Sequence, residues 1–280
     1  MAEQATAPEV SANPSAKPSA WVTALSKPVT AVGDLAIFGF QVIAAMPRPP
    51  YRLAIFFAQL EFMAWGSLFV VGLTGLFTGM VLSLQLVQAF GLFNAQGLVG
   101  ATIELALARE LAPIFTCIVV VARVGSAVAT ELGTMRVTEQ IDALETMAVD
   151  PLNYLVTPRV LAAAVATPLL TMLFNAVALL GAYLIAVFTK DMSPGTFLNR
   201  IELLVELGDL TQGMAKGSVI GFVVTMIACF RGYKADGGAR GVGIATTEAV
   251  VGGLIAIFAI DYIYTAIALS LQGQTGGLGV

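Results

Sequence analysis

The sequence predicts an all-α polytopic membrane protein, on the evidence of its composition and its long uncharged runs. Hydrophobic residues make up 58% of the 280 residues and charged residues only 11%, against about 45–50% and about 25% in soluble domains. Phe62 to Ile103 and Val160 to Thr189 contain no charged residue, and each run exceeds the ~20 residues needed to span a bilayer as a helix. The 28 glycines and 10 methionines add small and adaptable residues, as the packing of membrane helices favours.

The chain before the first span is expected to lie outside the bilayer core. Residues 1–20 are rich in Ala, Pro and Ser, which predicts a disordered tail with no signal-peptide pattern. Residues 21–63 predict interfacial or elbow helices, interrupted by the prolines at 47, 49 and 50. The apolar positions that recur there at helical spacing are Val29, Val32, Leu35, Val42 and Met46. A sixth span over residues 29–46 is the alternative.

Five spans are expected in a transmembrane domain over residues 64–272. Their approximate limits are 64–90, 98–130, 160–189, 211–230 and 249–271. Asn94, Gln96 and Gly97 mark the first turn, and polar connections cover residues 131–159, 190–210 and 231–247. Residues 273–280 form a short tail.

The distribution of Lys and Arg predicts the orientation, because cytoplasmic loops carry an excess of them. With the N-terminus in the cytoplasm and five spans, the C-terminal tail lies in the periplasm and most cations lie inside. The cytoplasmic set is then Lys17, Lys27, Arg48, Arg52, Arg136, Arg159, Arg231, Lys234 and Arg240, and the outer set is Lys190 and Arg200. A sixth span would put the first four cations on the outer side.

The residue inventory excludes several classes of function. The chain has no His, and its two cysteines, Cys117 and Cys229, lie in apolar stretches, so we expect no metal site and no catalytic residue. No phosphate-binding loop of the G-x-x-x-x-G-K-[ST] type is present, so any ATP must be bound by another subunit. The net charge of −4 gives no reason to expect nucleic acid.

The connection between the second and third spans predicts a short acidic amphipathic helix. Val137, Ile141, Leu144 and Ala148 share one helix face, while Glu139, Asp142 and Glu145 occupy the rest of its surface, and Pro151 is expected to end it. Such a helix either docks into the groove of a partner or is a solvated connection.

Five segments of the chain resemble the MlaE/YrbE family of permeases. They read E-L-G-T-M-R-V-T-E-Q-I-D-A-L-E-T-M-A-V-D-P at 131–151, Y-L-V-T-P-R at 154–159, G-M-V-L-S-L-Q at 79–85, A-R-E-L-A-P at 108–113 and G-V-G-I-A-T-T-E-A-V-V at 241–251. The resemblance runs from about residue 30 to the end, in the family's order. Ala112 stands where the family usually has Gly.

The resemblance implies a homodimeric, non-enzymatic subunit of an ABC transporter in the bacterial inner membrane. Such transporters move phospholipids between the inner and outer membranes and maintain outer-membrane lipid asymmetry. A separate ATPase subunit binds ATP and Mg, a ring of MCE-domain proteins lies on the periplasmic side, and a STAS-domain protein often binds the ATPase. The acidic cytoplasmic helix would be the coupling helix to the ATPase, through Val137, Thr138, Glu139, Ile141, Asp142, Leu144, Glu145 and Met147.

Charges inside the predicted spans are costly and mark functional or paired structural sites. We expect Glu110 of the second span and Lys216 of the fourth to form a central gating pair at the dimer centre; the family carries a Glu and a Lys at these motif positions. The alternative is a structural salt bridge, or pairing of Arg109 with Glu104, without a role in transport. Arg123 could extend to the cytoplasmic end. Asp261 is expected to be structural and bonded to Arg123 or to Thr and Tyr hydroxyls.

A face of small residues indicates where two helices pack closely, and an apolar face indicates where lipid could bind. Gly213, Gly217 and Gly221 form a G-x-x-x-G-x-x-x-G stripe, used either at a dimer interface or within one chain. A face towards the outer mouth is the candidate lining for acyl chains, with lipid-facing or core packing as the alternative. Its residues are Leu82, Leu86, Phe90 and Phe93, together with Leu111.

Two other classes of function have less support in the sequence. A proton-coupled secondary carrier would use Glu110 and Lys216, but no inverted repeat is seen between the halves of the chain. An intramembrane enzyme acting on lipids lacks a suitable set of His, Cys or Ser/Asp side chains.

Overall fold

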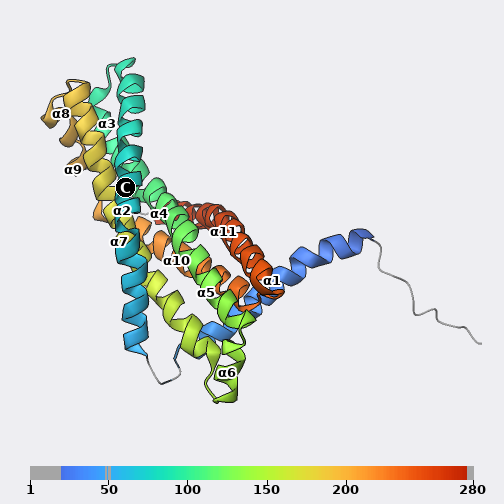
Figure 1. The fold of residues 1–280 in the computed structure, drawn as a ribbon. Helices are drawn as coiled ribbons and strands as arrows, with labels where there is room; N and C mark the ends of the chain where they lie inside the picture. Colours follow the sequence, from blue (N-terminus) through green and yellow to red (C-terminus); the bar gives the residue numbers. More distant parts are fainter. Residues whose placement is uncertain (1–19, 48, 50–51, 276–280) are drawn as a thin grey trace, which may run out of the picture. The chain divides into compact units, whose positions relative to one another are not determined.

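The computed structural model describes residues 20–47, 49 and 52–275 (Figure 1). Helices are the only regular secondary structure in these residues, and five of them are long and apolar enough to cross a membrane. The predicted all-α polytopic fold is therefore confirmed. Most of the N-terminal tail and the last five residues lie outside the described part of the chain.

The five spans extend further than their apolar runs. They cover Leu53–Gly91, Gln96–Val137, Leu152–Thr189, Leu207–Tyr233 and Gly238–Ser270. The first is the single helix α2 (Leu53–Gly91), so residues 53–63 are continuous with the first span. The fourth is α10 (Leu207–Tyr233), and the fifth belongs to α11 (Gly238–Thr275). Polar residues at the ends lengthen the helices because backbone hydrogen bonding continues past the apolar core.

Two π-helical turns interrupt the second span, and the third span has one at each end. The second consists of η1 (Gln96–Leu98), α3 (Val99–Ala106), η2 (Leu107–Leu111), α4 (Ala112–Val120), η3 (Val121–Gly125) and α5 (Ser126–Val137). The third consists of η4 (Leu152–Val156), α7 (Thr157–Leu184) and η5 (Ile185–Thr189). Between the third and fourth spans lie the short helices α8 (Pro194–Leu198) and α9 (Ile201–Leu204).

The N-terminal helix α1 runs from Ala20 to Ala45. The chain divides into two compact units, residues 1–40 and 41–280, and the second unit holds all five spans. Both the interfacial role of this helix and the alternative of a sixth span over residues 29–46 stay predictions.

Glycines let α2 and α7 lie backbone to backbone (Figure 1). A Cβ at Gly79 would come 1.8 Å from the carbonyl oxygen of Ala178, and one at Gly181 would come 2.4 Å from that of Leu76. Close approach of this kind makes van der Waals contact the main attraction between membrane helices.

The glycine stripe of α10 packs inside the chain. A Cβ at Gly213 would lie 2.0 Å from the carbonyl oxygen of Ala108, and one at Gly221 would lie 2.1 Å from Thr167 Oγ1. The stripe therefore meets the second and third spans, and α10 is the most buried of the five. Of the two uses left open for this stripe, the structure shows the intramolecular one.

The connection after the second span differs from the predicted helix. Val137 ends α5, Glu139 adopts a left-handed conformation with φ 60°, and only Gln140–Thr146 form the separate helix α6. Ala148 has φ 57° and lies outside α6. Pro151 does not end this helix but precedes η4, because its fixed φ suits the start of a helix.

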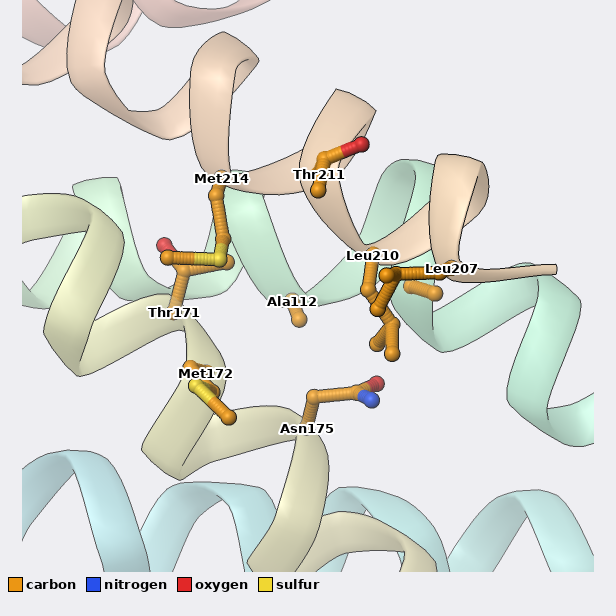
Figure 2. Close-up of a pocket in the computed structure, with 9 residues that line it drawn as sticks. Ala112, Thr171, Met172, Asn175, Leu207, Leu210, Thr211 and Met214 are labelled. Atoms are coloured by element: carbon orange, nitrogen blue, oxygen red, sulfur yellow. The ribbon is translucent and has the colours of Figure 1, made fainter.

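A small cavity lies between the second span, α7 and the start of α10, whose other end contacts α6 (Figure 2). Its volume is about 80 Å³. The side chains around it are mostly apolar: Ala108, Ala112, Thr171, Met172, Asn175, Leu207, Leu210, Thr211 and Met214.

Candidate functional site

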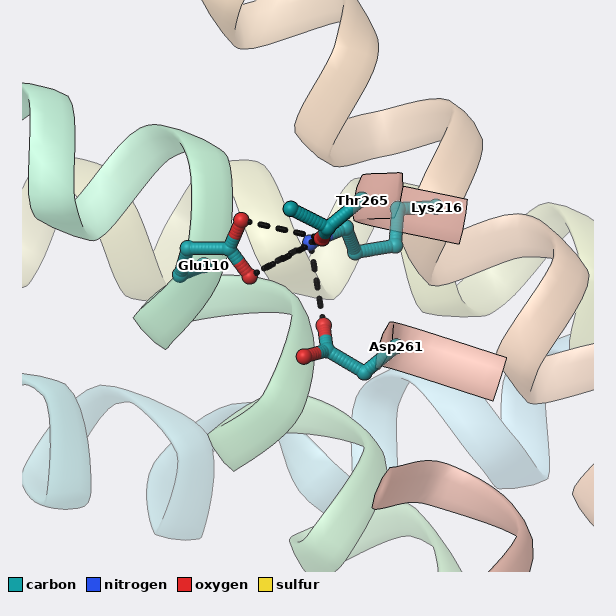
Figure 3. Close-up of polar contacts among 4 residues, drawn as sticks. All are labelled: Glu110, Lys216, Asp261 and Thr265. Carbon is teal, nitrogen blue, oxygen red and sulfur yellow. Dashed lines mark hydrogen bonds and ion pairs between the residues drawn. The ribbon is translucent and has the colours of Figure 1, made fainter. Parts of the chain in front are cut away.

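Four side chains from three spans form an ion cluster (Figure 3). Lys216 of α10 donates from Nζ to Glu110 Oε2 of η2 at 2.6 Å and to Thr265 Oγ1 of α11 at 2.8 Å. The Thr265 hydroxyl in turn donates to Glu110 Oε1 at 3.0 Å. Asp261 Oδ1 lies 3.0 Å from Lys216 Nζ as an ion pair, although its angles fall outside those of a hydrogen bond. The cluster thus ties the second, fourth and fifth spans together.

The π-turn that carries Glu110 follows from a nearby proline. Pro113 lacks an N–H, and its ring clashes with the carbonyl four residues earlier, which is that of Arg109. The backbone relieves this by widening one turn: Ala112 N–H donates to Leu107 O, five residues back. Widened turns of this type are frequent at functional sites.

The members of the cluster differ in exposure. The side chain of Lys216 is 0% exposed, that of Asp261 16% and that of Glu110 38%. One buried ammonium therefore faces two carboxylates, and the more exposed carboxylate is on the π-turn. A lone ammonium at this depth would cost several kcal/mol, and its partners offset that cost.

The direct contact of Glu110 with Lys216 matches the pair expected from the sequence, whereas the expected partners of Asp261 were wrong. Asp261 pairs with Lys216, not with Arg123. Arg123 instead crosses to α2, where Nη1 donates to Phe62 O at 3.2 Å and to Ser67 Oγ at 3.1 Å. Gly66 makes room, since a Cβ there would lie 1.9 Å from Arg123 Nη2.

Arg109 and Glu104 have separate partners, so the pairing of these two residues that was considered from the sequence does not form. Arg109 binds Asp209 Oδ1 through Nε and Nη2, at 2.7 and 2.6 Å. Asp209 also accepts from Glu206 N, which caps the start of α10. Glu104 accepts from Asn175 Nδ2 at 2.6 Å. Arg109 therefore anchors the N-terminus of α10 against the second span.

The sequence missed Thr265 as a member of the cluster. Asp261 and Thr265 are four residues apart on α11 and hence on one helix face. This four-residue spacing is the sequence feature that would have placed Thr265 beside Asp261.

The predicted coupling residues divide between α5, the turn and α6. Ile141 is buried, Val137 and Leu144 are half-buried, and the remainder are exposed: Thr138, Glu139, Asp142, Glu145 and Met147. Two of the acids have partners within the chain, because Arg136 pairs with Asp142 and Tyr233 Oη lies 3.4 Å from Glu145 Oε1. Their contact with another subunit stays a prediction.

An apolar cavity of about 400 Å³ includes part of the predicted lipid-lining face. Leu82 and Leu111 line it, together with Phe77, Thr78, Val81 and Phe115. Leu86 and Phe90 are half-buried and Phe93 is 79% exposed, and these three are not among its lining residues. Leu111 follows Glu110 directly, so the cavity borders the π-turn. The sequence missed Phe77, which lies five residues before Leu82, and Phe115, which lies one helical turn after Leu111.

Among the described residues, no cluster of acidic or cysteine side chains forms a metal site. The ion cluster holds three spans together through buried charges, and it lies beside an apolar cavity. Buried charges held between spans are typical of membrane transport proteins.

The comparisons with known proteins agree with that class. The model of a family described as Permease MlaE matches residues 56–267, and the chain belongs to the MlaE permease family. Members of this family are permease subunits of ABC transporters, which are membrane components and not enzymes.

Similar proteins come from distant sources. A probable ABC transporter permease protein of Rickettsia felis is 39% identical over 234 residues, which is 84% of this chain and 90% of the relative. The intermembrane phospholipid transport system permease protein MlaE of Haemophilus influenzae is 34% identical over 252 residues, or 88% and 97% of the two chains. The chloroplastic protein TRIGALACTOSYLDIACYLGLYCEROL 1 of Arabidopsis thaliana is 37% identical over 78% of this chain and 62% of its own.

Proposed function

We propose that this permease moves phospholipids between the inner and outer membranes of a bacterium and so maintains outer-membrane lipid asymmetry. The observation that carries the proposal is the similarity to a permease named for intermembrane phospholipid transport, which extends over nearly the whole of that relative. The five spans would lie in the inner membrane, with the N-terminus in the cytoplasm and the C-terminus in the periplasm.

The energy would come from a separate ATPase subunit that binds ATP and Mg. Its docking element would be α6 with the turn before it, because this segment connects two spans and exposes Glu139, Asp142 and Met147. An acidic rim around an apolar side chain suits a basic groove on the partner. The chain would act as a homodimer beneath a periplasmic ring of MCE-domain proteins, with a STAS-domain protein on the ATPase.

The ion cluster would act as the gate. Glu110 is the most exposed of its charged members and adjoins Leu111 of the apolar cavity. Acyl chains would occupy the cavity lined by Leu82 and Leu111. Opening this region would separate Glu110 from Lys216 or let water in between them, so movement of lipid would be linked to the cluster.

Complementation of a strain that lacks its own permease tests the proposal. The wild-type chain, expressed with its partner subunits, should restore resistance to detergent and large antibiotics. Lys216→Ala should not restore it, and a blot of the membrane fraction measures how much of the variant accumulates. Full restoration by Lys216→Ala would remove the gate from the proposal, and no restoration by the wild type would contradict phospholipid transport.

A further inference from the structure

A second buried carboxyl group lies outside the ion cluster. Glu104 on α3 and Asn175 on α7 are only 4% and 6% exposed. Asn175 Nδ2 donates to Glu104 Oε1 at 2.6 Å. This orientation of the amide is the one that the contact requires, since an ionised carboxylate has no proton to donate.

Two oxygen atoms of this pair, Glu104 Oε2 and Asn175 Oδ1, accept no hydrogen bond from another group of the protein. An unpaired buried acceptor costs free energy, and an ionised carboxylate inside a membrane span costs more. Within the described part of the chain, no cation lies at ion-pair distance from Glu104. The nearest cation along its span, Arg109, is bound to Asp209.

The elements packed against α3 supply no other compensating charge. On the second span, Glu110 is bound to Lys216. No ionisable group on α2, on α7, or on α9 and its N-cap residue lies at hydrogen-bond or ion-pair distance from Glu104. These groups are Glu61, Arg159, Tyr183, Arg200 and Glu202. In particular, Arg159 is bound to Glu131.

We propose that Glu104 is a proton-binding site, in which the carboxyl group is held neutral and its Oε2–H donates to Asn175 Oδ1. The proton comes from solvent water, and the only bond formed is O–H. One proton removes the buried charge and gives both unpaired oxygens a partner. The result is a carboxylic acid–amide pair with two hydrogen bonds that joins the second span to the third.

The small cavity offers a route for this proton. Asn175 is one of its lining residues, and Leu207 and Thr211, also on its wall, are exposed (Figure 2). A volume of about 80 Å³ is large enough to hold water. Exchange would therefore occur near the start of α10.

Protonation of Glu104 in the folded protein fixes the sign of a pH effect. An unfolded chain exposes Glu104 to water, where a glutamate is ionised at neutral pH. Near neutral pH the folded protein then binds one more proton than the unfolded protein at this position. Stability must accordingly fall as pH rises. Glutamine at 104 carries N–H where the neutral acid carries O–H, so Glu104→Gln should keep both hydrogen bonds at every pH.

Infrared difference spectroscopy of the full-length protein in lipid nanodiscs tests the protonation directly. The wild type should show the C=O stretch of a protonated carboxylic acid at about pH 7. This band should be absent from Glu104→Gln and shifted in Asn175→Leu, which removes the acceptor. A spectrum unchanged by Glu104→Gln would overturn the proposal.

Thermal unfolding of the same samples provides a second test. Between about pH 6 and about pH 8.5, the melting temperature of the wild type should fall by a few degrees relative to Glu104→Gln. Glu202→Gln, an exposed acid on α9, is the matched control and should follow the wild type. If Glu104→Gln is less stable than the wild type at both pH values, Glu104 is ionised and the proposal fails. Phospholipid transport measured in parallel keeps this outcome separate from the proposed function.

Discussion

Lys216 is the side chain on which the ion cluster depends, because it is the only cation bound to Glu110 and Asp261 in the described structure. Its side chain is 0% exposed. Lys216→Met should therefore leave two neighbouring carboxylates uncompensated and cost about 3–5 kcal/mol of stability. Urea or thermal unfolding of the purified protein measures this loss.

The triple variant Lys216→Met/Glu110→Gln/Asp261→Asn is the control for that loss. It removes all three charges together and should recover most of the stability, since buried ion groups replaced as a set are often neutral in effect. Equal instability of the single and triple variants would show that packing, not charge, makes Lys216 necessary.

Exchanging the two charges distinguishes a cluster from a simple pair. The double variant Glu110→Lys/Lys216→Glu would restore function if only these two residues interacted. In the structure, Asp261 lies 3.0 Å from Lys216, so a carboxylate at 216 would face a second carboxylate. We expect the exchange to fail in the complementation assay and to recover partly when Asp261→Asn is added. Full recovery by the exchange alone would contradict the three-charge cluster.

At the scale of single residues, the sequence predicted contacts where chemistry left few choices. Lys216 needed an anion inside the membrane, and Glu110 was the candidate named. Asp261 could not be assigned in the same way, because Arg123, the cation named for it, is bound to α2 and Lys216 of α10 takes its place. The sequence does not record which neighbouring helix each of these side chains faces.

Helix packing gives a prediction with an internal control on α2. Gly79→Ala places a methyl group where the Ala178 carbonyl oxygen would lie 1.8 Å away. It should cost about 1–3 kcal/mol through forced separation of α2 and α7. Gly72→Ala on the same helix meets no atom within 4 Å and should be neutral or stabilising by up to about 1 kcal/mol. Similar effects of both substitutions on the melting temperature would contradict the close approach.

The helix α6 gives the prediction on coupling. Asp142→Lys/Glu145→Lys reverses two exposed charges while Ile141 stays buried beneath them, so the spans should remain folded. We expect much less ATPase to co-purify with this variant. Glu202→Lys on α9, at the opposite end of the bundle, should retain the ATPase. Unchanged co-purification and ATPase activity in the α6 variant would exclude this helix as the docking element.

The number and order of the spans could be predicted from the sequence because uncharged length is enough to define them. The ends of the helices could not be predicted in this way, because helical turns made of polar residues extend a helix as readily as apolar ones. The acidic segment after the second span shows how far periodicity can predict a helix. Its apolar residues do recur at i, i+4 and i+7, yet Glu139 adopts a left-handed conformation and separates α5 from α6. A periodic pattern does not record such a break.

For the whole molecule, the orientation predicted from Lys and Arg can be tested by cysteine labelling. Cys117 and Cys229 are both buried, so the native cysteines should not react with the label. Asp191→Cys, in the connection after the third span, should react with a membrane-impermeant maleimide added outside intact spheroplasts. Arg240→Cys, near the start of α11, should react only after the membrane is opened. The reverse pattern would invert the topology.

Reconstitution tests the central claim of ATP-driven phospholipid movement most directly. The permease and its ATPase would be placed in liposomes that contain a fluorescent phospholipid, and transfer to or from the purified MCE ring would be followed with time. We expect transfer that requires ATP and Mg, is abolished by Lys216→Ala and is unaffected by Glu202→Gln. Transfer that proceeds equally without ATP, or none with an assembled and ATP-hydrolysing complex, would contradict the assignment.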